Sequence, residues 1–306
     1  MFSKKKRVVE EARRILARYP RLDPHKAALI LRRRILEWMA RRGPEKLLED
    51  YGDIADAASL YPHNSEASVV LVIAEHILDT GLHEGVPGKK YSIAIRRIAE
   101  ILERADSEYL ERSTRALTLE LFPDADILAS TGGEILHASI MGARSKIEVV
   151  RAPFLSPYGK GKSLVEDLDA EGIPSLWVPD HMRPVAVERS DFIFIPVYAV
   201  TREGLIVTDY GVAPAVETAA RMDKAVMALH SWTGLLALFE AGSLESLPRI
   251  EGIRLYDTVD PDEYNIKLVT DKFVIDTSRE KLLNLAGEEV KGVKEIVRAA
   301  IRSVTG

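Results

Sequence analysis

Two patterns of hydrophobic residues divide the chain into two parts. In the first part, hydrophobic residues such as Val8, Ala12 and Ile15 recur every three or four positions, which is the spacing of amphipathic helices. In the second part, short runs of Val, Ile, Leu and Phe alternate with stretches of helical spacing, as in a parallel sheet whose strands are joined by helices. We therefore expect an α/β protein with a helical bundle domain at residues 1–122 and a Rossmann-like, mostly parallel sheet domain at residues 123–306.

The same patterns place the individual elements. The helices expected in the first part are 5–19, 24–42, 45–58, 66–80, 90–105 and 107–122. The strands expected in the second part are 126–130, 146–152, 175–180, 192–200, 205–208, 225–229 and 267–270, with helices at 134–143, 162–171, 181–187, 212–222 and 286–303. Strands 192–200 and 205–208 are close enough to form an antiparallel hairpin. Ligands of such sheets bind at the carboxyl ends of the strands, so the residues that follow the strands are the candidates for a site.

The turn Ser130–Gly133 follows the first expected strand, where a helix begins. Two glycines allow a sharp turn and a close approach to a ligand, and the first turn of a helix leaves N–H groups unpaired. Ser130, Thr131, Gly132 and Gly133 are therefore candidates for an anion or phosphate cradle. The alternative is structural: Ser130 caps the helix and the glycines serve only the turn. Glu134, in the first helical turn, would repel a phosphate.

Two further candidate sites follow later strands. Lys160 and Lys162 lie in a Gly-Lys-Gly-Lys-Ser run, where they can contact a phosphate, or the run is a solvated loop with Ser163 as a helix cap. The run lacks the full GxxxxGK[ST] pattern, which excludes P-loop NTPase chemistry. Asp180 and His181 end a strand, and an acid beside a histidine can orient a hydroxyl or move a proton. Alternatively, Asp180 caps the helix that follows.

Composition narrows the class of protein. The chain has 306 residues, of which 46% are hydrophobic and 29% charged, as in a globular protein. Its 42 basic and 47 acidic side chains give a formal charge of -5, which argues against a chain-wide nucleic-acid surface. Cysteine is absent, and no histidine has metal-ligand spacing, so we expect neither metal nor cofactor. No hydrophobic run reaches the roughly 18 residues of a membrane span, so we expect a cytoplasmic protein. Scarce Asn and Gln with abundant Glu and Arg are typical of a thermophilic, archaeal-type protein.

A cluster of arginines is the one local exception to this charge balance. It comprises Arg32, Arg33, Arg34, Arg41 and Arg42, all on the helix expected at 24–42. Such a cluster can bind RNA or phosphate, but on a helix it is more often a solvated face with acidic neighbours. We expect the solvated face, and RNA binding that weakens steeply with salt is the competing hypothesis.

An ordered series of segments carries a resemblance to a known family. The series comprises Asp126–Gly133, Gly161–Pro174, Leu176–Asp180, Asp191–Pro196, Glu203–Gly211, Tyr256–Tyr264 and Leu268–Asp271. In order and spacing it resembles the family that unites the alpha, beta and delta subunits of translation initiation factor 2B with ribose-1,5-bisphosphate isomerase and methylthioribose-1-phosphate isomerase. The resemblance implies a helical domain before a Rossmann-like sheet, and assembly through the sheet domain.

The chain departs from this family at the positions that perform the chemistry. The isomerases of the family transfer protons with a cysteine and an aspartate, and the resemblance places these on Thr131 and Tyr198; the family's lysine falls on Asp209. A threonine hydroxyl is far too weak an acid to replace a thiol, and a tyrosine with an ordinary pKa near 10 is a poor base. The resemblance therefore implies a divergent, non-catalytic member. Thr131, Tyr198 and Asp209 remain candidate ligand contacts.

Two functions from different classes follow. The first is an initiation factor 2B subunit-like protein without catalysis, which binds a nucleotide or sugar phosphate or acts only in assembly. The second is a sugar-phosphate aldose-ketose isomerase of the ribose-1,5-bisphosphate type, with Asp180 and His181 as catalytic residues. Either protein is expected to be at least a homodimer, and the hydrophobic hairpin strands 192–200 and 205–208 are the candidate contact surface.

Overall fold

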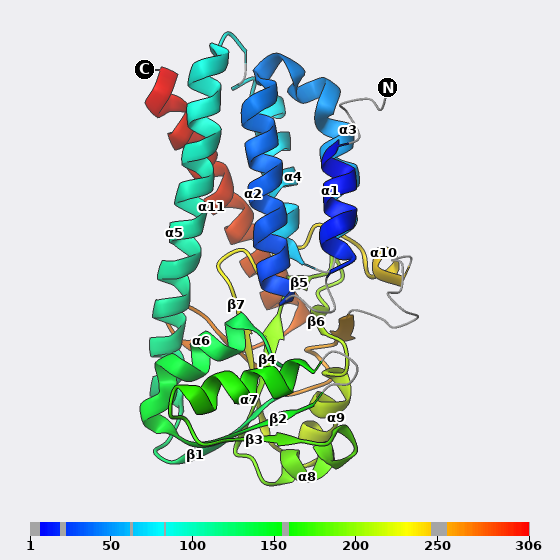
Figure 1. Ribbon diagram of the computed structural model, residues 1–306, viewed down its shortest axis with the longest axis vertical. Coiled ribbons are helices and arrows are strands. Elements are labelled where there is room, and N and C mark those ends of the chain that lie inside the picture. Colours follow the sequence, from blue (N-terminus) through cyan, green and yellow to red (C-terminus); the bar gives the residue numbers. More distant parts are fainter. Residues whose placement is uncertain are drawn as a thin grey trace.

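The chain folds into a helical part and an α/β part that lie end to end (Figure 1). This computed structural model describes residues 7–18, 23–61, 64–82, 84–154, 159–245 and 256–305. The architecture expected from the sequence, a helical bundle before a mostly parallel sheet, is confirmed. Both ends of the described chain lie at the far end of the helical part (Figure 1).

Capping side chains determine where two of the first helices begin. The helical part contains α1 (Arg7–Leu16), α2 (Pro24–Arg42), η3 (Pro44–Lys46), α3 (Leu47–Ala58), α4 (Ser65–Asp79) and α5 (Gly88–Glu120). Helix α2 starts at Pro24 because the Asp23 carboxylate accepts a hydrogen bond from the N–H of Lys26 at 2.8 Å. Helix α4 starts after Asn64, whose side chain accepts from the N–H of Glu66.

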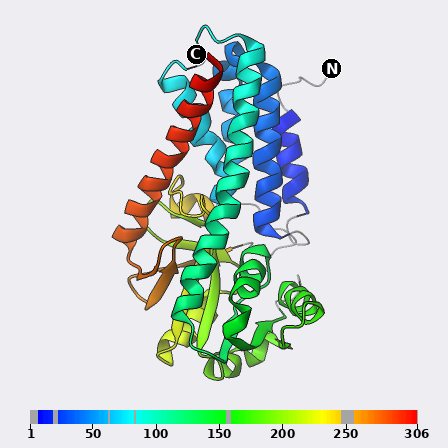
Figure 2. The same ribbon diagram turned by 90° about the vertical axis from the view of Figure 1, so that its left-hand side faces the viewer.

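Helix α5 joins the two parts as a single rod. The sequence predicted two helices, 90–105 and 107–122, and this division is wrong: α5 is continuous over 33 residues. No glycine or proline interrupts it, and Asp106, at the expected break, forms an ion pair with Arg32 instead of capping a new helix. At about 1.5 Å per residue, α5 is roughly 50 Å long. It therefore runs along both parts, packing on α2 and α11 at one end and on α6 at the other (Figures 1 and 2).

The main sheet has seven strands in the order β10-β9-β7-β4-β1-β2-β3. All its neighbouring strands are parallel except β10, which is antiparallel to β9. The strands are β1 (Ala125–Ala129), β2 (Ile147–Pro153), β3 (Ser175–Val178), β4 (Phe192–Val197), β7 (Ala225–His230), β9 (Ile266–Val269) and β10 (Val274–Asp276). One face is covered by α6 (Glu134–Ala143), α7 (Lys160–Ala170) and the end of α5, and the other by α8 (Arg183–Glu188), α9 (Ala213–Arg221) and the start of α11. Short helices η4 (Arg144–Lys146), η5 (Asp180–Met182) and α10 (Ala241–Glu245) complete the connections.

A second sheet contains the hairpin expected from the sequence. It has three antiparallel strands in the order β5 (Ala199–Val200), β6 (Ile206–Asp209) and β8 (Tyr256–Val259). The expected strand 192–200 therefore breaks at Tyr198, where the chain leaves the parallel sheet. Both hairpin strands are buried inside the protein, so the expectation that they form a contact surface is wrong.

The last helix, α11 (Arg279–Thr305), returns to the helical part. Its buried residues Val293, Val297 and Ile301 belong to the same core as the residues of α2 and α4. Figure 2 shows α11 running beside α5 along the bundle. The division of the chain at residues 122 and 123 stays a prediction, because the final helix packs with the first part.

Close backbone contacts make one glycine essential to the α/β part. A Cβ atom on Gly161, near the start of α7, would lie 1.7 Å from the carbonyl oxygen of Pro153 at the end of β2. Replacing Gly161 with Ala should therefore lower the free energy of unfolding by about 1–3 kcal/mol, the usual cost of overpacking. Gly287→Ala is the matched control, because nothing lies within 4 Å of a Cβ there, inside helix α11. Urea denaturation should show the control equal to or about 0.5–1 kcal/mol above wild type, and equal stability of Gly161→Ala would contradict the packing.

Candidate functional site

The order of the strands reverses between β1 and β4. From β1 the chain moves outward to β2 and β3, and then returns to the other side of β1 to form β4 and β7. At such a switch point the loops at the carboxyl ends of the two strands separate and leave a crevice. Ser130–Gly133 follows β1 and Tyr198 follows β4, so the predicted site lies at this point.

The centre of the site is the carboxylate of Asp209, at the end of β6. Lys160, the first residue of α7, places its Nζ 2.7 and 2.9 Å from the two carboxylate oxygens. The Thr131 hydroxyl donates to one of these oxygens at 3.0 Å. The side chains of Asp209 and Lys160 are 4% and 11% exposed, so the ion pair is shielded from water. The structure thus brings together three candidate residues that are far apart in the sequence.

The two glycines lie where only glycine fits. A Cβ on Gly132 would lie 2.0 Å from the carbonyl oxygen of Lys160. Gly133 has φ 139°, and a Cβ there would lie 2.5 Å from the carboxylate of Asp23 and 3.7 Å from the Tyr198 hydroxyl. Gly132, Gly133 and Tyr198 therefore border the same site.

Asp23 occupies the position that the sequence assigned to a bound anion. One oxygen of its carboxylate caps α2, and the other accepts a hydrogen bond from the N–H of Glu134 at 2.8 Å, at the first turn of α6. Ser130 is not the cap of α6, because its N–H pairs with the carbonyl of Phe194 and continues the strand. An Asp followed by Pro is a typical start of a helix, so the cap of α2 follows from the sequence, whereas this second role depends on the packing of α2 against α6.

The remaining candidates lie apart from Asp209. Lys162 projects from α7, about half exposed, and pairs with Glu166. Asp180 opens η5 and pairs with Arg183 at 3.4 Å, and His181 beside it is exposed. Ser163 is inside α7, so its expected role as a cap is wrong.

Arg32 of α2 belongs to a buried ionic cluster that was not predicted from the sequence. Arg32 is 2% exposed, and its guanidinium donates to Glu66 at 2.7 Å and to Asp106 at 2.6 Å. The second oxygen of Glu66 accepts from the hydroxyl of Ser231, which follows β7. The cluster therefore joins α2, α4 and α5 to the sheet. The sequence feature that could have indicated this cluster is Glu66, an acid just before the apolar run Ala67–Ala74.

The pKa values of the two acids of this cluster shift in opposite directions. Burial, together with the charge of Glu66, raises the pKa of Asp106 to about 7. Burial opposes ionisation of Glu66 too, but Arg32 and the hydrogen bond from Ser231 hold its pKa below the usual value. Beside the cluster, burial lowers the pKa of His230 to about 4, so its Nε2 accepts from the Tyr109 hydroxyl at 2.7 Å.

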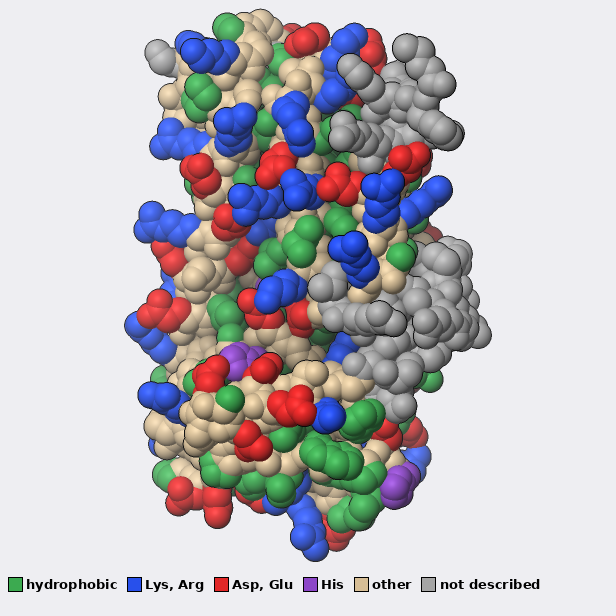
Figure 3. Space-filling view, viewed as in Figure 1, with side chains coloured by type: hydrophobic (Ala, Val, Ile, Leu, Met, Phe, Trp, Pro, Cys, Tyr) green, Lys and Arg blue, Asp and Glu red, His purple; other side chains and the backbone are tan. Residues whose placement is uncertain are grey.

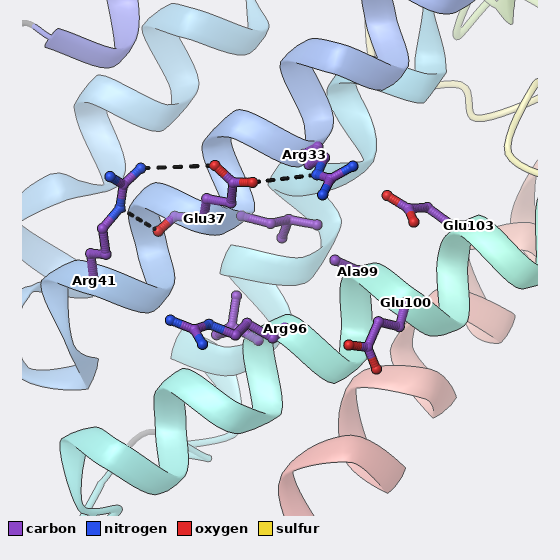
Figure 4. A pocket seen from close by; sticks show the side chains of 9 residues that line it. Arg33, Glu37, Arg41, Arg96, Ala99, Glu100 and Glu103 are labelled. Carbon is purple, nitrogen blue, oxygen red and sulfur yellow. Dashed lines mark hydrogen bonds and ion pairs between the residues drawn. The ribbon is translucent and has the colours of Figure 1, made fainter.

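The other arginines form the expected solvated face. Arg33 and Arg41 are about two-thirds exposed and both approach Glu37 (Figure 4). Arg42 pairs with Asp50 at 2.5 Å. The groove between α2 and α5 at this place has a volume of about 410 Å³. Acidic and basic side chains alternate over the visible face of the helical part (Figure 3). Arg32 is the exception, because it is buried rather than solvated.

Neither a metal site nor a membrane-spanning helix is found in the described part of the chain. No group of three or more His, Cys, Asp or Glu side chains there has the geometry of a metal site. No helix among the same residues is long and apolar enough to cross a bilayer.

A helical bundle on the carboxyl edge of a Rossmann-like sheet defines a class of two-part proteins. A chain of the tetrameric eIF2B-beta2-delta2 complex from C. thermophilum matches with a TM-score of 0.71 and 16% identity, over 92% of this chain and 95% of that chain. Translation initiation factor eIF-2B from Pyrococcus horikoshii matches with a TM-score of 0.65 and 12% identity, over 89% and 98%. The 5-methylthioribose 1-phosphate isomerase of Pyrococcus horikoshii matches with a TM-score of 0.62 and 14% identity, over 94% and 88%. These likenesses establish a shared fold, in agreement with the resemblance seen in the sequence. No protein-family model and no curated protein sequence matches the chain.

The raised pKa of Asp106 predicts how stability depends on pH. The folded protein keeps the Asp106 proton up to about pH 7, while the unfolded chain releases it near pH 4. The stability that this proton contributes is present below pH 4 and is lost as the pH rises to 7. Asp106→Asn removes this titration, so the stability of wild type relative to Asp106→Asn should fall between pH 4.5 and pH 8.

Guanidinium denaturation at several pH values measures this difference. Glu100→Gln, on the exposed face of the same helix, should follow the pH dependence of wild type. A constant difference between wild type and Asp106→Asn across this range would contradict the assignment. Glu289, whose pKa is raised mainly by burial and to a smaller extent by the charges of Glu66 and Asp106, titrates in all three proteins.

Proposed function

We propose that the chain is a non-enzymatic assembly protein of the initiation factor 2B subunit type. The observation that carries this proposal is the ion pair of Asp209 with Lys160, together with the hydrogen bond from Thr131. The resemblance places the isomerases' cysteine on Thr131 and their aspartate on Tyr198. The Asp209 carboxylate is paired with a lysine at 2.7 Å, and the Asp23 carboxylate caps two helices, so neither is available as a base.

The occupied helix terminus supports assembly over phosphate binding. The N–H group of Glu134 that would bind a phosphate already binds Asp23. A nucleotide or sugar phosphate in this cradle would have to displace that carboxylate and approach Glu134 itself. A phosphorylated small molecule is therefore the weaker of the two non-catalytic functions that the sequence allows.

Isomerase assays test the absence of catalysis. We expect no turnover of ribose 1,5-bisphosphate or methylthioribose 1-phosphate above the rate without protein, because the groups for proton transfer are missing. Turnover that is lost in Asp180→Asn and kept in Asp167→Asn, an acid on α7, would overturn the proposal in favour of an isomerase. Turnover abolished by Asp209→Asn would overturn it as well, with a different base.

We further propose that the protein is a homodimer with β3 in the interface. Strand β3 is the edge of the main sheet, and its Leu176 and Trp177 are 55% and 53% exposed. Met182 and Val185, on the following η5 and α8, are also exposed. Hydrophobic side chains gather at this lower end of the molecule (Figure 3). An edge strand with large apolar side chains is a surface that another chain usually covers.

Sedimentation at micromolar concentration tests the dimer. We expect wild type to sediment as a dimer and Trp177→Asp as a folded monomer, because the charge would be buried in the interface. Leu119→Lys is the control, because Leu119 is 85% exposed on α5, away from β3. A monomeric wild type, or equal effects of the two substitutions, would contradict the proposed interface.

A further inference from the structure

A cavity of about 340 Å³ lies between the helical part and the sheet. It is bounded by α2, α5, the first turn of α6 and the residue that follows β7. Its apolar lining includes Leu29, Leu110 and Ile135, and its polar lining includes His25, Asp106 and Ser231. A volume of this size, in which apolar side chains lie beside polar and charged ones, can hold a small molecule.

The charges around the cavity are predominantly negative. Arg32, Arg33, Asp106, Glu103 and Glu134 line it. Glu66 adds a further carboxylate, because it binds the far side of the Arg32 guanidinium. At pH 8, above the pKa of about 7 of Asp106, four carboxylates therefore face two guanidiniums. Arg32 is fully used, since its two ends are bound to Glu66 and Asp106.

Two polar atoms in this lining have no hydrogen-bond partner among the described residues. One is Nδ1 of His25, whose side chain is 9% exposed and which lies 3.9 Å from a carboxylate oxygen of Glu66, beyond hydrogen-bond distance. The other is Oδ1 of Asp106, whose second oxygen is bound by Arg32. Buried polar atoms in folded proteins nearly always have a partner, so two orphaned polar atoms beside one cavity indicate a missing polar partner.

We propose that this cavity binds a small organic cation, with an ammonium or amidinium group and a short apolar part. The cationic group donates hydrogen bonds to Asp106 and His25 and balances the excess of carboxylates. The apolar part lies against Leu29, Leu110 and Ile135. An anion is disfavoured, because the one buried cation, Arg32, has no free donor edge and the rim carries Glu103 and Glu134. This site is separate from the crevice at Asp209, and it does not depend on the function proposed above.

Three compounds of the same shape and different charge test the proposal. They are 2-phenylethylamine, 2-phenylethanol and phenylacetate, titrated into the full chain by calorimetry at pH 8. We expect the amine to bind at least tenfold more tightly than the alcohol and the acid. It should also raise the melting temperature, because a ligand that binds only the folded state stabilises it.

Two variants and one control locate the binding. Asp106→Asn should weaken amine binding at least tenfold, because it removes the charge while keeping the shape and an acceptor for Arg32. Leu110→Phe should weaken it to a similar extent by filling the cavity without changing a charge. Glu100→Gln, an acid of the same helix outside this cavity, should bind the amine as wild type does.

Three results would overturn the proposal. Equal binding of amine and alcohol would make the cavity merely apolar, and tighter binding of phenylacetate would make it an anion site. Unchanged amine affinity in both Asp106→Asn and Leu110→Phe would place the binding elsewhere. Should a variant fail to fold, as judged by circular dichroism, the three compounds on the wild-type protein still decide the question, and no heat or melting shift with 10 mM amine refutes it.

Discussion

The structure depends on one buried polar seam, where the helical part meets the carboxyl ends of the strands. The N–H and hydroxyl of Ser65, at the start of α4, both contact the carbonyl oxygen of Tyr198, at 2.8 and 2.9 Å. Glu66 beside it binds Arg32 and Ser231. Asp23 binds the first turn of α6. Ser65, Glu66, Arg32 and Ser231 are removed from water, so each must keep its partner, and this requirement holds the two parts in one orientation.

This seam also determines what is left of the crevice. In an open sheet of this topology the carboxyl ends of β1 and β4 are the expected place for a ligand. Here the chain places its own groups there: Lys160 neutralises Asp209, and Asp23 satisfies an N–H of α6. The charged groups of the crevice are therefore paired within the chain. Oγ of Ser130 in the crevice, and Nδ1 of His25 and Oδ1 of Asp106 beside the neighbouring cavity, have no hydrogen-bond partner among the described residues.

Similarity of fold to both initiation factor subunits and a sugar-phosphate isomerase does not by itself select a function. The three solved structures share 12–16% identity with this chain, and they are two initiation factor proteins and one isomerase. Function in such folds resides in a few side chains at the strand ends. The proposed function depends on Thr131 and Tyr198, because neither side chain has the proton-transfer chemistry of a thiol or a carboxylate at neutral pH. The proposal of a non-catalytic protein therefore rests on these two side chains and on the ion pair beside them.

The sequence by itself determined the elements and the class of fold, because these depend on local periodicity, caps and turns. Asp23, Asn64 and the short apolar runs after Pro123 are examples, and the turn at Ser130–Gly133 was placed correctly between strand and helix. Only the tertiary structure decided which partner each charge has. Arg32 belonged to an arginine-rich helix face by pattern, yet it is buried, because Glu66 and Asp106 approach it from helices 34 and 74 residues away. Asp209 is a second example, because its partner Lys160 is 49 residues away in the sequence. Periodicity along one helix cannot report contacts between distant helices, and these contacts are what convert exposed charges into buried ion pairs.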